Sequence, residues 1–382
     1  MRKYVKGLQF RIRMNLETLH LLFFKNYEEV NLSLSPHINC FIGDNGSGKT
    51  NLLDAIHYLS LTKSAFNAAD TQTIKQGEEF FVVRGRFHSP IAEVPDEVIQ
   101  CSLRVGQKKT VTHNKQPYER ISDHIGRYPV VLISPYDTDL IRQGSEERRR
   151  YFDSLMSQLD HAYLELLITY SHILRQRNAL LKAANGHTYD RDYLLVLDEQ
   201  LAPVGEQLVQ LRQQFLEEFT PIFQRHYQQL SDDRESVSLA YKTQVPVIDF
   251  LKVLRLNERK DLVLQRTHAG PHRDDFLFLM NELPVKGYGS QGQQKSYAIA
   301  LKLAQFELLA TRKKQKPLLL LDDIFDRLDE KRITRLMQLV ADHTFGQVFL
   351  TDTHLDRTDR VLSTLSEQVS RFKVENGTVV PL

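Results

Sequence analysis

Cysteine is scarce in this sequence. Its 382 residues include two cysteines, Cys40 and Cys101, and their spacing matches no metal-binding or redox motif. Cys40 lies inside an apolar run, so we expect it to be a small buried residue. A chain without a disulfide framework is typical of a reducing, cytosolic compartment, and we predict a cytoplasmic protein.

Long hydrophobic runs are also missing. No apolar stretch approaches the roughly 20 residues that a membrane-spanning helix needs. The basic N-terminus lacks the apolar segment and cleavage site of a secretory signal. Repeats and low-complexity tracts are absent as well. We therefore expect no association with a membrane.

Charge of one sign is not in excess. The formal net charge is +2, with 41% hydrophobic and 26% charged residues, which is ordinary for a globular protein. This balance does not indicate nucleic acid on its own, so any DNA-binding surface must be a local patch. At ~100–200 residues per domain, the length predicts two domains, or one large domain with an insertion.

A phosphate-binding motif is present near the N-terminus. Residues 43–50 read GDNGSGKT and match the pattern G-x-x-x-x-G-K-[ST] at every required position. Residues 38–42 before it resemble a buried strand, and residues 51–59 after it have helical apolar spacing. A chance glycine-rich turn would not be expected in this context. The predicted nucleotide-binding residues are Gly43, Asp44, Asn45, Gly46, Ser47, Gly48, Lys49, Thr50 and Asn51.

The residue types in this motif predict how ATP is bound. Glycines let backbone N–H groups wrap a triphosphate, and the N-terminus of the following helix favours its negative charge. Lys49 is expected to reach the β- and γ-phosphates, where it acts in catalysis as well as binding. Thr50 is expected to hold Mg²⁺ through its hydroxyl.

A second motif supplies carboxylates. Residues 318–321 are four leucines, followed by Asp322 and Asp323, which is the Walker B pattern of a buried parallel strand that ends in acids. Asp322 is predicted to hold Mg²⁺, and Asp323 to orient or deprotonate the attacking water. A buried strand with a polar end would look the same by itself, but the phosphate-binding loop in the same chain favours the catalytic interpretation.

A third segment predicts another anion site. Residues 287–295 read GYGSQGQQK and lead into a helix with apolar residues on one face. The hydroxyl of Ser290 and the free N–H groups at the helix start favour an anion, although a capped core helix has the same pattern. Together with the first loop, this segment predicts a homodimer in which two protomers sandwich two ATP molecules. Its predicted nucleotide-binding residues are Ser290, Gln291, Gly292 and Gln293.

Strand patterns dominate the first part of the chain. Residues 1–13 read as a basic extension, and we expect Met14 to be the initiator, which the intact mass of the native protein would test. Residues 16–34 predict a hairpin beside the strand at 38–42. Residues 14–144 are accordingly predicted to be the N-terminal half of an ATPase head.

Helical patterns follow. They begin at Ser145, whose hydroxyl is expected to cap the helix, with two acids in the first turn. Residues 145–265 are predicted to be a mostly helical arm inserted between two halves of one ATPase core. Residues 266–382 then return to the head with the SQGQQ and Walker B segments.

These motifs, in this order, resemble the RecF family of bacterial recombination mediators within the ABC/SMC ATPase superfamily. The similarity runs from about Met14 nearly to the end of the chain. The resemblance implies an α/β P-loop NTPase of the ABC/SMC/Rad50-like head type with an inserted helical arm or lid domain. The segments that carry it are 43–50, Leu140-Ile141 with 148–153, the GPHRDD loop at 270–275, the SQGQQ signature at 290–294, Asp322-Asp323, and Leu328-Asp329.

The resemblance also implies a function. It implies a weak ATPase that uses ATP and Mg²⁺, and whose ATP-dependent homodimer clamps duplex DNA, gapped DNA or single-strand/duplex junctions. Binding would rest on phosphate contacts and depend strongly on salt, and slow hydrolysis would reset the clamp. The implied partners are RecR, with RecO, and the recombinase that is loaded at single-strand gaps during repair, replication and the SOS response.

Three positions depart from the family pattern. Lys295 stands where the signature usually ends in arginine, which keeps the charge but loses the planar fork. Asp326-Arg327 replaces the usual Ser-Glu before Leu328-Asp329, so the contacts of this D-loop stay open. Residues 63–67 lack an arginine that the family leads us to expect, and the role of that arginine is unassigned in this chain.

Several charged residues keep two interpretations. Arg148, Arg149 and Arg150 are either a solvated helix face or contacts to DNA or to nucleotide across the dimer. His272 and Arg273 are either a satisfied loop pair or part of a site near the nucleotide, which their place before the signature favours. The candidates for a polar switch after the Walker B strand are Thr351, Asp352, Thr353 and His354.

Three other classes of protein contain related motifs. The ATPase subunit of a transporter would carry Leu-Ser-Gly-Gly-Gln, which is absent, and would lack so large a helical insertion. An SMC or Rad50-type protein would need longer arms with sustained heptads. A fused nuclease would need an acidic domain after the ATPase, whereas this sequence ends at Leu382, soon after the last predicted core strand.

Overall fold

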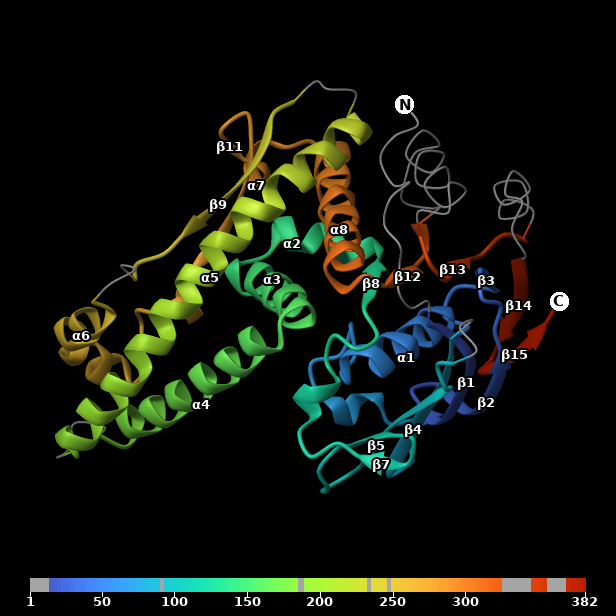
Figure 1. The fold of residues 1–382 in the computed structure, drawn as a ribbon, viewed down its shortest axis with the longest axis horizontal. Coiled ribbons are helices and arrows are strands. Elements are labelled where there is room, and N and C mark those ends of the chain that lie inside the picture. Colours follow the sequence, from blue (N-terminus) through green and yellow to red (C-terminus); the bar gives the residue numbers. More distant parts are fainter. Residues whose placement is uncertain are drawn as a thin grey trace. The chain divides into compact units, whose positions relative to one another are not determined.

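The computed structural model describes residues 14–89, 93–184, 189–231, 235–245, 249–324, 345–355 and 369–382. The expected extension at 1–13 and the D-loop segment, including Asp326-Arg327 and Leu328-Asp329, lie outside these residues. Contacts divide the chain into two compact units, which are Met1–Asp137 with Lys302–Leu382, and Thr138–Leu301. Each unit is described by itself, and Figure 1 shows their elements.

A mostly parallel sheet forms the centre of the first unit. Its order is β15-β14-β3-β13-β12-β8, and every neighbouring pair is parallel except β14 with β15. β3, β12 and β13 are buried along their whole length, as expected for mostly apolar strands covered on both faces. The bounds are β3 Ile38–Ile42, β8 Val130–Ile133, β12 Leu318–Leu321, β13 Val348–Asp352, β14 Val369–Glu375 and β15 Thr378–Pro381.

An antiparallel sheet forms the second layer of this unit. Its order is β2-β1-β4-β5-β6-β7. Buried and exposed residues alternate along β2 and β4, which is the pattern of strands with one face in the core and one in solvent. The bounds are β1 Asn15–Phe24, β2 Tyr27–Ser33, β4 Phe80–His88, β5 Glu97–Arg104, β6 Thr110–His113 and β7 Gln116–Pro117.

The predicted hairpin at 16–34 is confirmed, but its predicted place is wrong. β1 pairs with β2 and β4 in the antiparallel sheet, whereas β3 pairs with β13 and β14 in the parallel one. The cause is the difference in patterning, because the alternating strands β2 and β4 suit a half-exposed sheet and the fully buried, mostly apolar β3 suits a buried one.

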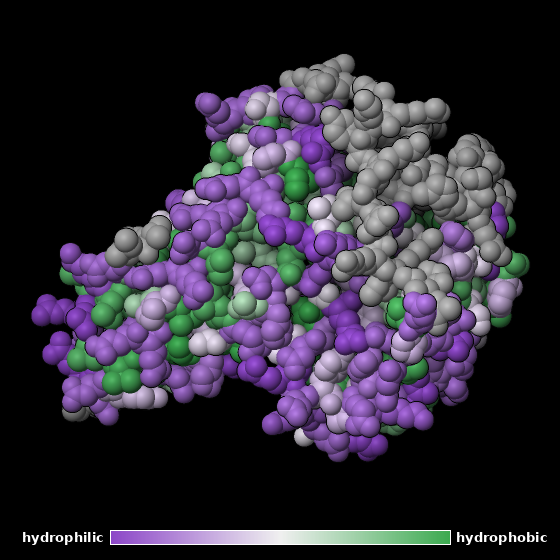
Figure 2. Space-filling view, in the orientation of Figure 1, coloured by the Kyte–Doolittle hydropathy of each residue, from purple (hydrophilic) through white to green (hydrophobic). Residues whose placement is uncertain are grey.

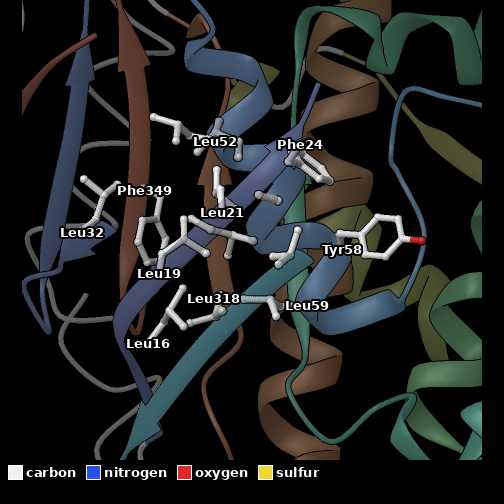
Figure 3. Packing of buried hydrophobic residues seen from close by; sticks show 14 of the residues in the cluster. Leu16, Leu19, Leu21, Phe24, Leu32, Leu52, Tyr58, Leu59, Leu318 and Phe349 are labelled. Carbon is white, nitrogen blue, oxygen red and sulfur yellow. The ribbon is translucent and has the colours of Figure 1, made fainter. Parts of the chain in front are cut away.

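Helix α1 (Lys49–Leu61) lies between the two sheets, and the main core forms around it. Figure 3 shows side chains from all three layers meeting there, with Leu19 from β1, Leu52 from α1 and Phe349 from β13 among them. The spacing of buried residues along α1 covers most of the helix surface, as expected for a helix between two sheets. This core fixes the start of α1 at the edge of the parallel sheet.

The second unit is mostly helical. Its long helices are packed beside a three-stranded sheet of order β11-β10-β9. The bounds are α2 Asp139–Arg142, α3 Ser145–Leu159, α4 His161–Ala184, α5 Arg191–Ser231, α6 Phe250–Leu264, α7 Val285–Tyr288, β9 Val237–Lys242, β10 Asp275–Met280 and β11 Leu283–Pro284. Helix α8 (Gln291–Lys313) begins in this unit and ends in the first.

The start of α3 differs from the prediction in one detail. Gly144, not Ser145, is the N-cap, and no side chain caps the helix. The Ser145 hydroxyl instead accepts a hydrogen bond from Arg149 Nη1 at 2.8 Å. The predicted acids Glu146 and Glu147 do occupy the first turn, where they favour the positive end of the helix dipole.

Contacts group residues 266–301 with the helical arm rather than with the ATPase head. β10 pairs with β9 along its whole length, and Arg212 of α5 donates to the Pro271 carbonyl at 2.8 Å. The sequence-based domain boundaries at 144/145 and 265/266 stay a prediction. Among the described residues, no helix has the length and apolar character needed to cross a bilayer.

Candidate functional site

The loop of residues 43–50 joins β3 to α1 and depends on glycine at two positions. Gly48 has φ of 118°, and a Cβ there would lie 2.4 Å from Asn26 Nδ2 and 2.6 Å from the Tyr27 hydroxyl. A Cβ at Gly43 would lie 2.1 Å from the carbonyl oxygen of Val374 in β14. Larger residues would therefore push the loop away from the strands that position it.

Lys49 lies at the first position of α1 with its ammonium folded under the loop. Its Nζ donates to the carbonyl oxygens of Gly43 at 2.8 Å and Asp44 at 2.9 Å. Lys49 is only 6% exposed. The loop thus encloses the amine that would meet a phosphate, and Asp44, Asn45 and Gly46 above it are exposed.

The two predicted metal-binding residues are in direct contact. The Thr50 hydroxyl donates to Asp322 at 2.9 Å to Oδ1 and 3.1 Å to Oδ2, across 272 residues of sequence. This contact arises because β3 and β12 both end at the same edge of the sheet, with β13 between them. A hydroxyl and a carboxylate are hard oxygen ligands, so the pair fits Mg²⁺.

Thr351 joins the two Walker B acids. Its hydroxyl donates to Asp322 Oδ1 at 2.9 Å and accepts the backbone N–H of Asp323 at 2.9 Å. Asp323 has a positive φ of 48°, a conformation that is uncommon for a residue with a side chain and is held here by this bond. Among the four switch candidates, Thr351 thus contacts both Walker B residues through its side chain.

The other switch candidates have local roles in the structure. The Asp352 carboxylate accepts the backbone N–H groups of Thr353 at 2.7 Å and His354 at 3.3 Å. Asp352 is buried and its carbonyl accepts the N–H of Gly43 at 3.3 Å, so it connects β13 to the phosphate-binding loop.

Burial controls the electrostatics of this edge. Desolvation raises the pKa of Asp322, the nearby charge of Asp323 raises it further, and the hydrogen bonds from Thr50 and Thr351 oppose the shift. A divalent cation beside Asp322 would offset the free-energy cost of burying the charged carboxylate. Ser47 has a buried hydroxyl with no hydrogen-bond partner among the described residues, which fits a phosphate oxygen as its missing partner.

Two residues of this site escaped the sequence prediction. Asn26, in the turn between β1 and β2, donates through Nδ2 to the Ser47 carbonyl at 3.2 Å, and the hydroxyl of Tyr27, the first residue of β2, donates to the Gly48 carbonyl at 2.9 Å. The predicted residue Asn51 donates to Asn26 Oδ1 at 2.7 Å. Only the tertiary approach of the hairpin turn reveals this role, because no motif marks the turn.

The SQGQQ segment lies in the second unit, at the start of α8. Ser290 and Gln293 form a reciprocal capping box, in which the Ser290 N–H donates to Gln293 Oε1 at 2.7 Å and the Gln293 N–H donates to the Ser290 hydroxyl at 3.3 Å. Gln293 Nε2 also donates to Glu235 at 2.8 Å. Ser290 and Gln291 are exposed and Gly292 is half-buried, so this helix start is accessible to a ligand.

Arg148 and Arg149 are structural residues of the arm. Arg148 holds the Asp275 carboxylate with two bonds, at 2.8 Å from Nε and 3.0 Å from Nη2. Arg149 Nη1 donates to the Asp274 carbonyl at 2.6 Å. Arg150 is exposed and pairs within its own helix with acids at Glu146 and Glu147.

Both ring nitrogens of His272 lie beside hydrogen-bonding partners of the second unit. Its Nδ1 lies 2.7 Å from the Tyr170 hydroxyl and its Nε2 lies 3.1 Å from the Thr267 carbonyl. Burial lowers the pKa of His272 to about 4, so the ring is neutral near pH 7. The neighbouring Arg273 is exposed.

Comparison with known proteins gives a consistent result. Residues 15–379 match the model of the RecF/RecN/SMC N-terminal domain family. The protein named DNA replication and repair protein RecF from Cytophaga hutchinsonii is 47% identical over 367 residues, which is 96% of each chain. The protein of the same name from Flavobacterium johnsoniae is 46% identical over 362 residues, covering 94% of this chain and all of that one.

Solved structures agree with the sequences. The structure of the recombination mediator protein RecF with ATP, from the RecFOR pathway, is 29% identical with a TM-score of 0.88, covering 97% of this chain and 98% of that one. An Smc head domain from Pyrococcus furiosus, with an extended coiled coil, is 18% identical with a TM-score of 0.55, covering 97% and 96%. The second likeness concerns the fold alone.

Proposed function

The chain belongs to the RecF family of ABC/SMC-type ATPases, and we propose that it is an ATP-gated DNA-binding protein of recombinational repair and replication. The contact of Thr50 with Asp322 carries this proposal, because it joins the Walker A and Walker B motifs into one site at 2.9 Å. Relatives at 41–47% identity are DNA replication and repair proteins, which supports the same function.

Different residues of the first unit bind ATP and hydrolyse it. The N–H groups of residues 43–50 bind the triphosphate, and Lys49 exchanges its two carbonyl partners for phosphate oxygens. Thr50 and Asp322 hold Mg²⁺, which neutralises charge on the phosphates. Asp323, fixed by Thr351, orients or deprotonates the attacking water.

The helix start at Ser290 supplies the other half of a composite site. ATP joins two protomers, with each phosphate-binding loop facing the partner's signature segment. The exposed Ser290 and Gln291 and the N-terminal end of α8 support this arrangement, because a helix N-terminus favours negative charge. The joined heads and arms then clamp duplex or gapped DNA, and slow hydrolysis releases it.

The partners follow from the pathway. A solved relative belongs to the RecFOR pathway, so we assign RecR, with RecO, as the protein partners of this chain. Together they load the recombinase at single-strand gaps in the cytoplasm. The transporter alternative is disfavoured, since the RecF structures match at TM-scores of 0.86 and 0.88 over 97% of the chain.

Two variants test the assignment of the ATPase site. Asp323→Asn keeps the loop and its lysine, so it should bind ATP normally and hydrolyse it roughly 10²-fold more slowly or worse. Lys49→Ala should lose ATP binding itself. Filter binding of labelled ATP and release of phosphate separate the two defects. Wild-type hydrolysis by Asp323→Asn would overturn the role of Asp323, and wild-type ATP binding by Lys49→Ala would overturn the site.

A further inference from the structure

A groove of about 350 Å³ lies on the outer face of the antiparallel sheet, in the same unit as the ATPase site. Side chains of two cross-strand rows line it. One row pairs Thr18 of β1 with Arg86 of β4, and the other runs from His20 through Arg84 to Gln100 of β5. The opposite face of these strands is in the core, so the groove faces solvent.

The lining of this groove is cationic. Arg84, Arg86 and Lys115 all border it, and no aspartate or glutamate does among the residues that the structure describes. Arg86 is paired with two carboxylates that do not line the groove, Glu17 at 3.0 Å and Asp96 at 4.0 Å. Arg84 has only the neutral amide oxygen of Gln100 as a side-chain partner in the described ranges, at 2.9 Å. Arg84 and Lys115 therefore have no carboxylate partner among the described residues, and their positive charge is available to a ligand.

Lys115 is held over the groove in an unfavourable backbone conformation. The turn between β6 and β7 places Asn114 at φ 49° and Lys115 at φ 69°, where glycine would be favoured. Asn114 fixes this turn to β5, because its side chain accepts the N–H of Val98 at 2.7 Å and its own N–H donates to the Val98 carbonyl at 2.8 Å. This unfavourable conformation occurs at a position where the side chain of Lys115 adds a positive charge to the groove.

We propose that this groove binds the sugar-phosphate backbone of duplex DNA. Arg84 and Arg86 lie two residues apart on one strand, about 7 Å along it, so they suit successive phosphates better than one small anion. Gln100 and Thr112 add neutral donors in the same row. The surface over β4, β5 and β7 is predominantly hydrophilic in Figure 2, as a phosphate-contacting face requires.

The lining also indicates which form of nucleic acid is bound. Apart from the His20 imidazole, no aromatic ring lines the groove among the residues described, so it offers no platform on which bases of a single strand could stack. Contacts to phosphates position a duplex without reading its sequence. This inference rests on the proposed function and names the surface through which the first unit meets DNA.

The test compares the wild-type chain with one double variant and a matched control by anisotropy of a labelled duplex in ATP·Mg²⁺. Arg84→Ala with Lys115→Gly removes two cations that have no carboxylate partner among the described residues, and glycine suits the φ of 69° at the second position, so folding should not suffer. Arg104→Ala is the control, because Arg104 lies on β5 outside the groove and pairs with Glu79 at 3.3 Å. Binding of a fluorescent ATP analogue should be unchanged in all three.

We expect the groove variant to bind duplex several-fold more weakly, with the slope of log affinity against log salt reduced by about 1 for each cation removed. Arg104→Ala should match the wild type. Wild-type affinity and slope in the groove variant would overturn the groove while leaving the proposed function intact. A wild-type chain that binds no DNA with ATP would overturn both.

Discussion

At the scale of single residues, the buried carboxylate of Asp322 shows a conflict between stability and function. The folded protein holds this carboxyl group where burial and the charge of Asp323 raise its pKa. Without a cation the charged form is disfavoured by folding, so the carboxylate lowers the stability of the ATP-free protein near pH 7. The proposed role of Asp322 in holding Mg²⁺ would account for a carboxylate at this buried position.

Asp322→Asn should therefore raise the melting temperature of the ATP-free protein while abolishing hydrolysis. The amide keeps the size of the side chain and removes the charge that burial penalises. Thermal unfolding with and without ATP·Mg²⁺ measures this, and the gain on adding ATP·Mg²⁺ should shrink in the variant. A variant that is less stable than the wild type without nucleotide would contradict this view of Asp322.

His272 makes the stability of the arm depend on pH. Its pKa falls from 6.5 to about 4 on burial, so between these values the unfolded chain binds more protons than the folded one. Stability is then full above pH 6.5 and is lost as pH falls toward 4. Between pH 7.5 and pH 5 this group should contribute a loss of about 2 kcal/mol.

His272→Gln should remove that part of the pH dependence, although it lowers stability at pH 7.5 by disturbing the bonds to Tyr170 and Thr267. Urea unfolding at the two pH values measures the difference. His161→Gln is the control, since its ring is 49% exposed. If His272→Gln loses as much stability as the wild type between these values, His272 is not the titrating group.

Individual site residues could be predicted where a local motif required them. The loop glycines, Lys49, Thr50 and Asp322 follow from patterns that span a few positions, and their contacts in the structure agree with those patterns. Asn26 could not be predicted, because its contact with Ser47 depends on how a hairpin of one sheet meets a loop of another.

At the scale of elements, the sequence predicted which segments form helices or strands better than it predicted which strands pair with one another. Apolar runs predicted buried strands at 38–42 and 318–321, and both are buried strands in the structure, β3 and β12. The hairpin at 16–34 was predicted beside the strand at 38–42, whereas β1 pairs with β2 and β4, since strand partners depend on contacts distant in sequence. The contacts of Arg148 with Asp275 and of Arg149 with the Asp274 carbonyl likewise could not be predicted, because these partners are distant in sequence.

Helix α8 combines a structural cap with the proposed signature function, and two substitutions at Ser290 can separate them. Ser290→Ala removes the hydroxyl that accepts the Gln293 N–H, which should cost about 1 kcal/mol of stability. Ser290→Asp can cap the helix equally well and favours its dipole, so the fold should be kept.

The charge of Ser290→Asp would face the triphosphate of the partner protomer. We therefore expect a stable protein that binds ATP through its own loop but fails to dimerise with it. Sedimentation with ATP in the Asp323→Asn background, where hydrolysis is slow, reports the dimer. Normal ATP-dependent dimers of Ser290→Asp would show that Ser290 serves only as a helix cap.

At the scale of the whole molecule, the order of the motifs predicted the family, which the relatives and solved structures confirm. The contacts that unite residues 266–301 with the arm were not predictable, because they depend on the pairing of β10 with β9 and on the buried Arg212. The sequence also gave no indication of the cationic groove. Its members come from four strands and one turn, and no two of them form a motif.

The central claim is that ATP gates the binding of DNA, and one titration tests it most directly. A labelled gapped duplex is titrated with wild-type protein and with Lys49→Ala, with and without ATP·Mg²⁺, and its fluorescence anisotropy is followed at several salt concentrations. The account predicts tight, salt-sensitive binding by the wild type that requires ATP and is lost in Lys49→Ala. Equal, weak binding under every condition would contradict it.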